Sequence, residues 1–338
     1  MKKIPFLLAL FLIFSCKTTK QSTAKIVFDL SNYKNSITEA ELKTHLYVVA
    51  SDSMEGRQTG SIGQKRAGNY LIKHYKKNQI EAPVGASDYY QKIASEFLQT
   101  RGGAKLEASE NICAFIKGTE KPEEIIVISA HYDHIGARKN AIFYGADDNA
   151  TGTVALLEIA QAFKKAQLDG FGPKRSVLFL HVTGEEHGLL GSIYYANHPL
   201  FSIANTVCDL NIDMIGRRDE DHPKTNNYVY VIGADRLSTD LHNCVIEANK
   251  AFCQLDLDYK YNDPNDPNHY YERSDHYNFA KLGIPSVFLF NGVHADYHRA
   301  TDTADKIEFD ALAKRTQLAF VIAWEIANRK DRIAVDKK

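Results

Sequence analysis

Acidic and imidazole side chains follow four apolar runs of the chain, and these residue types could bind metal ions. The runs cover residues 124–130, 176–182, 207–212 and 286–290, and the side chains that follow them are His131 and Asp133, Glu185 and Glu186, Asp213, and Tyr297 and His298. The turn YGADDNATG adds Asp147 and Asp148 between small residues. Carboxylates and imidazoles gathered at one place repel and desolvate one another without a cation, and Zn²⁺ accepts mixed nitrogen and oxygen ligands. The pattern therefore favours a zinc site.

Each of these residues taken alone has a simpler interpretation. Asp147 or Asp148 could cap a helix N-terminus, and Glu185 and Glu186 could be first-turn acids favoured by a helix dipole. Asp213 is harder to explain in this way, because an acid at the end of an apolar strand needs a partner. A carboxylate on a turn of Gly and Ala could also bridge two cations about 3.5–4 Å apart, an arrangement that clamps a hydrolytic transition state from both sides.

The elements that must position these side chains alternate between strands and helices. Amphipathic spacing predicts helices over 39–50, 61–77, 151–165, 188–197, 238–252 and 309–329, and apolar or β-branched runs predict strands over 111–117, 124–130, 176–182, 207–214, 228–232 and 286–290. Continuous apolar strands between helices indicate a sheet that is buried on both faces. We therefore predict an α/β fold, a single-domain three-layer α/β/α sandwich with a mixed, mostly parallel central sheet. Ligands of such sheets bind at the carboxyl ends of the strands, where the acids and imidazoles lie.

The N-terminus indicates export. Two lysines precede an apolar run that is too short to span a bilayer, and the run ends in Ile-Phe-Ser-Cys16, which resembles a bacterial lipobox. We expect a lipoprotein signal peptide over 1–15, a lipidated Cys16, a polar tether over 16–35 and one folded domain over 36–338. The simpler alternative is a plain secretory signal with an incidental cysteine. The lipid would anchor the chain in a membrane, and we expect the periplasmic face of the outer membrane.

Charge and cysteine content exclude other classes of site. The 338-residue chain has a net charge of −1, which gives no electrostatic case for nucleic-acid binding. The cysteines beyond Cys16 form no CxxC motif or Cys/His cluster, so thiolate metal sites are not expected and buried free thiols are.

Six motifs, in this order, carry a family resemblance. They are SAHYDHIG, YGADDNATGT, TGEEHGLLGS, NIDMIGR, RSDHYNFAKLGIPSVF and DYHRATDTADKI. Together they resemble the co-catalytic zinc aminopeptidases, which are related to glutamate carboxypeptidase and the glutaminyl cyclases. The resemblance covers Glu39 to Arg329. Many relatives carry an inserted protease-associated domain upstream of the first zinc ligand, and residues 88–110 are too few to contain one.

The resemblance implies two Zn²⁺ per chain and assigns their ligands. Asp147 would bridge the two ions, His131 and Asp213 would complete one site, and Glu186 and His298 would complete the other. Family members have a cis peptide bond after the bridging aspartate, which here would join Asp147 to Asp148.

The resemblance also assigns the remaining roles. Glu185 would be the general base that takes the proton of a zinc-activated water and passes it to the leaving amine. Asp133 would fix the imidazole tautomer of His131, and Tyr297 would donate a hydrogen bond to the oxyanion. His134 has no ligand role in the family pattern.

Three alternatives to an aminopeptidase stay open. Glutaminyl cyclases keep most ligand positions but bind one zinc in a tryptophan-lined pocket, whereas this chain has only Trp324 and places Tyr297 before the last histidine ligand. A carboxypeptidase would need a cation for the substrate carboxylate, for which Arg273 and Arg299 are candidates. A non-catalytic binding lipoprotein would have lost ligands, and this chain keeps all five together with Glu185.

Overall fold

The centre of the molecule is an eight-stranded mixed sheet. The computed structural model describes residues 27–100, 103 and 105–337. The strand order is β1-β2-β6-β3-β7-β10-β8-β9, and the four neighbouring strands β6, β3, β7 and β10 run parallel. Their bounds are Arg175–Val182, Lys121–His131, Thr206–Ile212 and Ser286–Phe290. Because these strands are parallel, their carboxyl ends meet at one edge of the sheet.

The outer strands extend the sheet on both sides. β2 pairs antiparallel with β6 and with β1, and β8 pairs antiparallel with β10 and parallel with β9. Their bounds are Tyr90–Ile93 for β1, Ser109–Ile116 for β2, Tyr228–Ile232 for β8 and Asp256–Asp258 for β9. Residues 94–108 alone connect β1 to β2. A separate hairpin joins β4 (Gly136–Arg138) to β5 (Ala141–Phe143).

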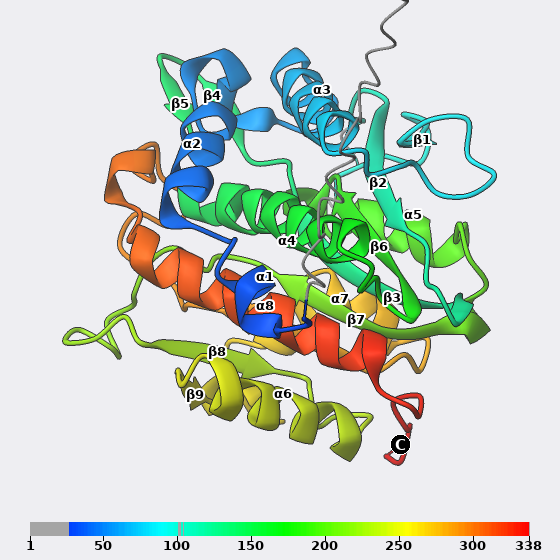
Figure 1. Ribbon diagram of the computed structural model, residues 1–338. Helices are drawn as coiled ribbons and strands as arrows, with labels where there is room; N and C mark the ends of the chain where they lie inside the picture. The colour runs from blue at the N-terminus through cyan, green and yellow to red at the C-terminus, as the bar shows by residue number, and fades with distance from the viewer. Residues whose placement is uncertain (1–26, 101–102, 104, 338) are drawn as a thin grey trace, which may run out of the picture.

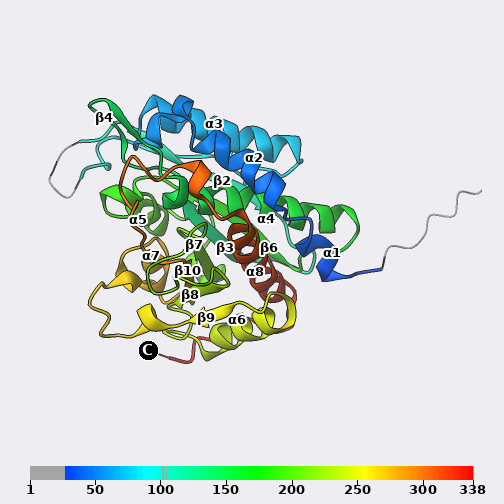
Figure 2. The ribbon, with the colours of Figure 1, turned by 90° about the vertical axis from the view of Figure 1, so that its left-hand side faces the viewer.

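Helices cover both faces of the sheet (Figures 1 and 2). One face carries α3 (Ile62–Lys77), α4 (Gly152–Leu168), α6 (Thr239–Phe252) and α8 (Phe309–Asn328), with α1 (Leu30–Lys34) and α2 (Glu39–Val49) packed outside them. The opposite face carries α5 (Leu190–Asn197) and the short α7 (His276–Ala280). The expected three-layer α/β/α sandwich is confirmed.

The strand sequences explain why the sheet lies between two layers. In β3, Ile126 and Ile128 belong to the core under α4 and α8, whereas Ile125 and Val127 belong to the core under α5 and α7. Successive side chains of a strand point to opposite faces, so a continuous apolar run must be covered twice. The four cysteines that the structure describes are buried and free, as expected.

The polar tether expected over 16–35 ends earlier than predicted. Asp29 accepts a hydrogen bond from the backbone N–H of Ser31 and begins α1, in which Leu30 and Tyr33 are buried. Phe28 stacks on Trp324 of α8 with 5.6 Å between the ring centroids. Residues 27–35 are therefore part of the folded domain. The expected signal peptide, Cys16 and the rest of the tether lie outside the described residues.

None of the helices in the described part of the chain combines the length and apolar character that crossing a membrane requires.

Candidate metal centre and active site

The carboxyl ends of the parallel strands bring the expected side chains to one edge. His131 is the last residue of β3, and Asp213 follows β7 directly. Glu185 and Glu186 lie in a single turn of 3₁₀ helix after β6, and His298 lies in the loop after β10. Open α/β sheets bind their ligands at this edge.

Asp148 lies at the centre of these side chains. Its Oδ1 is 3.3 Å from Nε2 of His131, which is itself 3.3 Å from Oδ1 of Asp213. Its Oδ2 is 3.1 Å from Nε2 of His298, which is 3.2 Å from Oε2 of Glu186. Each oxygen of the Asp148 carboxylate thus faces a different group of ligand atoms.

The bridging position expected for Asp147 is occupied by Asp148. Oδ1 of Asp147 accepts the backbone N–H of Gly216 at 2.7 Å. Its Oδ2 contacts the amide nitrogen of Asn291 at 3.0 Å and Nε2 of His294 at 3.1 Å. Asp147 is therefore a buried structural acid that points away from the ligand atoms. The expectation was wrong by one residue, because two adjacent acids in one motif carry no sequence signal for which of them points to the site.

The cis peptide bond is displaced by the same single residue. It joins Asp148 to Asn149, whereas the expectation placed it between Asp147 and Asp148. In both descriptions the cis bond follows the acid at the centre of the site.

The turn that presents Asp148 is held by residues that the sequence alone did not single out. Asp302 accepts the backbone N–H of Asp147 at 3.0 Å and that of Asp148 at 3.2 Å. The buried guanidinium of Arg57 donates to the carbonyl of Gly145 at 2.9 Å. Gly145 has a φ of 55°, and a Cβ at this position would lie 2.2 Å from the carbonyl oxygen of Asp148. The tight turn therefore requires glycine.

The chemistry of this cluster fits divalent cations. The cluster contains two sets of three ligand atoms, and within each set the atoms lie within 4.8 Å of one another. One set comes from His131, Asp148 and Asp213, and the other comes from His134, Asp148 and Glu186. Oδ2 of Asp148 and Oε1 of Glu186 are buried, and no donor among the described residues reaches them with hydrogen-bond geometry. Buried carboxylate oxygens without a donor are costly, and a metal ion is the partner that would satisfy them.

The pKa values of the two histidine ligand candidates show the same need for positive charge. Burial lowers the pKa of His298, but its contacts with Asp148 and Glu186 raise it to about 10. Burial likewise opposes protonation of His131, but Asp213 and the neighbouring acids raise its pKa well above the ordinary value. The acids thus hold positive charge at this place, as ligands of a cation would.

His134 lies closer to the centre than the sequence indicated. Its Nδ1 is 2.6 Å from Oε1 of Glu186, and both of its ring nitrogens are buried without hydrogen-bond geometry to any described residue. The family pattern assigns it no role, so motif matching alone could not have found it.

Asp133 contacts His131 through its main-chain carbonyl, whereas its carboxylate has a second role. Nδ1 of His131 donates to the backbone carbonyl of Asp133 at 3.1 Å, which leaves Nε2 facing the other ligand atoms. The Asp133 carboxylate accepts the hydroxyl of Thr59 at 2.8 Å and the backbone N–H of Glu185 at 3.2 Å. The main chain of Asp133 therefore fixes the tautomer of His131, and its side chain fixes the turn that carries Glu185.

A chain of buried hydrogen bonds ends on Asp213. Ser274 donates to Oδ2 of Asp213 at 2.8 Å and accepts the side-chain amide of Asn211 at 2.7 Å. Ser129 lies 3.0 Å from the amide oxygen of Asn211 and 2.8 Å from Oδ1 of Asp209. A hydroxyl donates only one proton, so Ser129 can donate to Asn211 when Asp209 is protonated. Burial raises the pKa of Asp209 well above its ordinary value, in agreement with this direction of donation.

Glu185 and Tyr297 face two cavities at the centre. The inner cavity, of about 30 Å³, is lined by acids and aromatic side chains that include Asp148, Asp213, Tyr270, Phe288 and Phe290. The outer cavity, of about 450 Å³, is lined by residues that include Thr100, Glu186, Leu189 and His298. Glu185, Tyr297 and Arg273 line both. Oε2 of Glu185 is 3.9 Å from Nε2 of His131, and burial and the nearby Glu186 and Asp213 raise the pKa of Glu185 well above its ordinary value.

The comparison with protein families agrees with this geometry. The model of peptidase family M28 matches residues 111–323, which is more than half of the chain. The chain belongs to peptidase family M28. The matched segment includes every candidate metal ligand and Glu185.

Proteins of other organisms show how far the likeness extends. A probable leucine aminopeptidase of Arthroderma benhamiae is 26% identical over 325 residues, which cover 92% of this chain and 84% of the relative. The solved structure of an aminopeptidase from Aneurinibacillus sp. strain AM-1 has a TM-score of 0.66 and 16% identity, and the match covers 92% of this chain and 98% of that one. The glutaminyl cyclase of Porphyromonas gingivalis has a TM-score of 0.64 and 17% identity over 84% and 97%. At these identities the solved structures show a shared fold.

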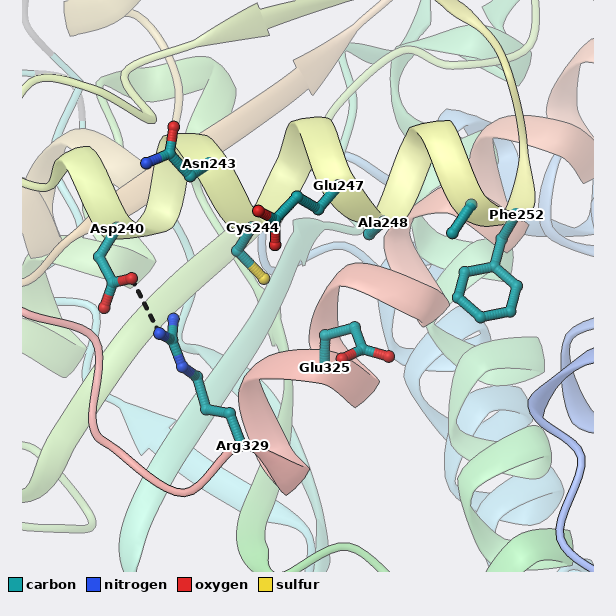
Figure 3. Close-up of a pocket in the computed structure, with 9 residues that line it drawn as sticks. Asp240, Asn243, Cys244, Glu247, Ala248, Phe252, Glu325 and Arg329 are labelled. Carbon is teal, nitrogen blue, oxygen red and sulfur yellow. Dashed lines mark hydrogen bonds and ion pairs between the residues drawn. The ribbon is translucent and has the colours of Figure 1, made fainter.

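A separate groove lies between α6 and the end of α8 (Figure 3). It measures about 520 Å³ and is lined by residues that include Cys244, Glu247 and Glu325. Asp240 forms an ion pair with Arg329 across it at 2.8 Å. The groove contains none of the candidate site residues.

Proposed function

We propose that this M28 peptidase is a zinc aminopeptidase that removes N-terminal residues from peptides. The observation that carries the proposal is the Asp148 carboxylate, which faces two groups of metal-ligand atoms while Glu185 lies beside them without being part of either group. Curated relatives that are named as leucine aminopeptidases support the hypothesis that the chain is an exopeptidase.

Two zinc ions would be held by five side chains. His131 and Asp213 would bind one, Glu186 and His298 the other, and Asp148 both. Bound zinc supplies Lewis-acid polarisation of the peptide carbonyl and makes a water more acidic at neutral pH. The nitrogen and oxygen atoms are those that zinc prefers in catalytic sites.

Glu185 is suited to move the proton. Its backbone is held by Asp133, and no described residue donates a hydrogen bond to its carboxylate. A free carboxylate on a fixed backbone can accept the proton of the attacking water and deliver it to the leaving amine. Tyr297 lines the same two cavities as Glu185, and its O–H could donate to the developing oxyanion.

The cyclase alternative is less well supported by the site. His131 and Asp213 form a complete second set of ligand atoms with Asp148, as a two-zinc site requires. The inner cavity contains tyrosine and phenylalanine where a cyclase would offer tryptophan. Likeness to the Porphyromonas cyclase concerns the fold and does not separate the two activities.

The activity is tested with peptides that differ only at their termini. Leu-Leu-NH₂ should be hydrolysed, its N-acetyl derivative should not, and a chelator should abolish hydrolysis until Zn²⁺ is restored. Release of the C-terminal residue from the acetylated peptide acid Ac-Leu-Leu would instead identify a carboxypeptidase, and cyclisation of glutaminyl peptides a cyclase.

The role of Glu185 is tested by Glu185→Gln. This variant keeps size and hydrogen bonding but cannot accept the proton, so turnover should fall by a factor of about 10² to 10⁴. Metal analysis should still return two zinc ions per chain, because Glu185 belongs to neither ligand set. Turnover equal to that of the wild type would remove Glu185 from the mechanism.

We also propose that the chain is a lipoprotein anchored through Cys16 on the periplasmic face of the outer membrane. The support is the charged, apolar and cysteine-terminated N-terminal sequence alone. Radiolabelled palmitate should be incorporated into the wild type and not into Cys16→Ser, and the wild type should fractionate with outer membranes. Release of an unlabelled wild-type protein into the soluble fraction would indicate a plain secretory signal.

A further inference from the structure

Arg273 occupies the wall shared by the two cavities of the site. It follows the short 3₁₀ turn Tyr270–Glu272, and its guanidinium lies over the ring of Tyr270 at 4.9 Å. One of its terminal nitrogens is 3.4 Å from the hydroxyl of Tyr297. Glu185 lines the same wall, so Arg273 lies close to where the scissile bond must sit.

Arg273 has aromatic and hydroxyl neighbours but no carboxylate partner among the described residues. No carboxylate of the described residues lies within 4.0 Å of its guanidinium, whereas Arg217 pairs with Asp296 at 3.1 Å and Arg218 with Glu308 at 3.1 Å. The side chain is exposed and reaches the cavities from above the Tyr270 ring. Among the described residues that line either cavity, Arg273 is the one arginine or lysine.

An unpaired guanidinium at this place matches a carboxylate of the substrate. The planar fork of arginine binds a carboxylate through two parallel hydrogen bonds, which gives both charge and geometric selection. Successive Cα atoms of a peptide are about 3.8 Å apart, so a group on the wall beside the scissile bond reaches substrate atoms about one residue away. On the leaving-group side of the bond, a carboxylate at that distance belongs to the second residue of the substrate.

We propose that Arg273 is a specificity-determining residue that selects substrates with a carboxylate on the residue after the scissile bond. This inference rests on the aminopeptidase activity proposed above. The carboxylate is either the C-terminus of a dipeptide or the side chain of an acidic second residue, and both present the same chemistry to the guanidinium.

Two matched substrate pairs separate these sources. Leu-Leu and Leu-Leu-NH₂ differ only in the terminal carboxylate, and Leu-Glu-NH₂ and Leu-Gln-NH₂ differ only in the side-chain carboxylate. The quantity measured is the ratio of kcat/KM for the acid to that for its neutral partner. For at least one pair the wild type should give a ratio of about ten, as expected for one charge-assisted hydrogen-bonded pair near solvent.

Substitution of Arg273 should remove the preference. In Arg273→Met the ratio should fall to about one, and in Arg273→Lys it should take an intermediate value, because lysine keeps the charge but loses the fork. Using a ratio cancels any effect of the substitution on Tyr297 that both substrates share. Arg299→Met is the control, because Arg299 is an exposed arginine that lines neither cavity, and it should keep the wild-type ratio.

Binding without turnover provides an independent readout. In the Glu185→Gln background, calorimetry should show tighter binding of the preferred acid than of its neutral partner, and adding Arg273→Met should equalise the two. A wild-type ratio of about one for both pairs, or a preference that survives Arg273→Met, would overturn the inference while the peptidase activity stands. Absence of hydrolysis of all four peptides would instead overturn the proposed function and the inference with it.

Discussion

At the scale of single residues, Asp147 and Asp148 show how one peptide unit separates two functions. Asp147 gives its oxygens to Gly216, Asn291 and His294, whereas Asp148 gives one oxygen to each group of ligand atoms. The first acid holds the loops around the site, and the second would hold the metal ions.

Exchanging each acid for its amide should separate these functions. Asp148→Asn should leave fewer than two zinc ions per chain and abolish turnover, because an amide cannot bridge two cations with two anionic oxygens. Asp147→Asn should retain zinc but lower the free energy of unfolding by about 1–3 kcal/mol, since it leaves buried donors such as His294 without their acceptor. Metal analysis and chemical denaturation measure both. Loss of zinc from Asp147→Asn with full zinc in Asp148→Asn would reverse the assignment.

Ser274 has a role that acts through Asp213. Its hydroxyl donates to Oδ2 of Asp213 while Oδ1 faces His131. Removing a hydrogen bond that orients a metal ligand typically weakens metal affinity by about 10–100-fold. Ser274→Ala should therefore raise the dissociation constant of zinc by this factor in a competition titration with a chelating dye. Ser274→Thr keeps the hydroxyl and should restore most of the affinity, and equal affinity in all three proteins would contradict the role.

At the scale of elements, long helices and strands buried on both faces could be predicted, whereas short elements without a continuous apolar run could not. The boundaries of β8 and β10 agree with their apolar runs residue for residue, because a strand buried on both faces leaves an uninterrupted signal. β1, β9 and α7 were not predicted, because these segments of three to five residues contain no continuous apolar run and are too short to show a period.

The same distinction holds for the site. Strand ends predicted which acids and imidazoles meet, because parallel topology brings them to one edge. The choice between Asp147 and Asp148 and the contributions of His134, Asp302 and Arg57 depend on side-chain directions in a compact turn, which have no period in the sequence.

Strand β6 also contains a buried histidine that should make stability depend on pH. Burial lowers the pKa of His181 to about 3, and its Nε2 contacts the hydroxyl of Tyr75 at 2.6 Å. The unfolded chain takes up a proton at this residue below its ordinary pKa of about 6.5, whereas the folded chain does not. His181 therefore opposes folding increasingly as the pH falls from 6.5 toward 3, by about 1.4 kcal/mol per pH unit.

The contribution is measured as a difference between proteins. The free energy of unfolding of the wild type, relative to that of His181→Gln, should decrease by about 1.4 kcal/mol for each pH unit between 6 and 4. The glutamine keeps a polar partner for Tyr75 without titrating. Parallel pH profiles for the two proteins would show that His181 titrates normally in the folded state.

At the scale of the whole molecule, the first described residues belong to the folded domain. Phe28, Leu30 and Tyr33 pack against the core near Trp324, and the Tyr33 hydroxyl contacts Asp169 at the end of α4. A chain that begins at Ser36 should unfold at a lower temperature than one that begins at Val27. Burying one such side chain contributes about 1.5–3 kcal/mol, so the difference should amount to several degrees. Identical melting temperatures would show that α1 contributes nothing.

The position of α1 also determines where an attachment at the N-terminus would act on the folded domain. Helix α4 starts beside the acids of the site and ends at the residue that Tyr33 contacts, so its seventeen residues separate the two places by about 25 Å. In Figure 2, α1 lies at one side of the molecule, and β4, which follows soon after the end of β3, lies at the other. An attachment placed ahead of Val27 would therefore act at the end of α4 that is remote from the acids, and the two cavities of the site would stay open to solvent.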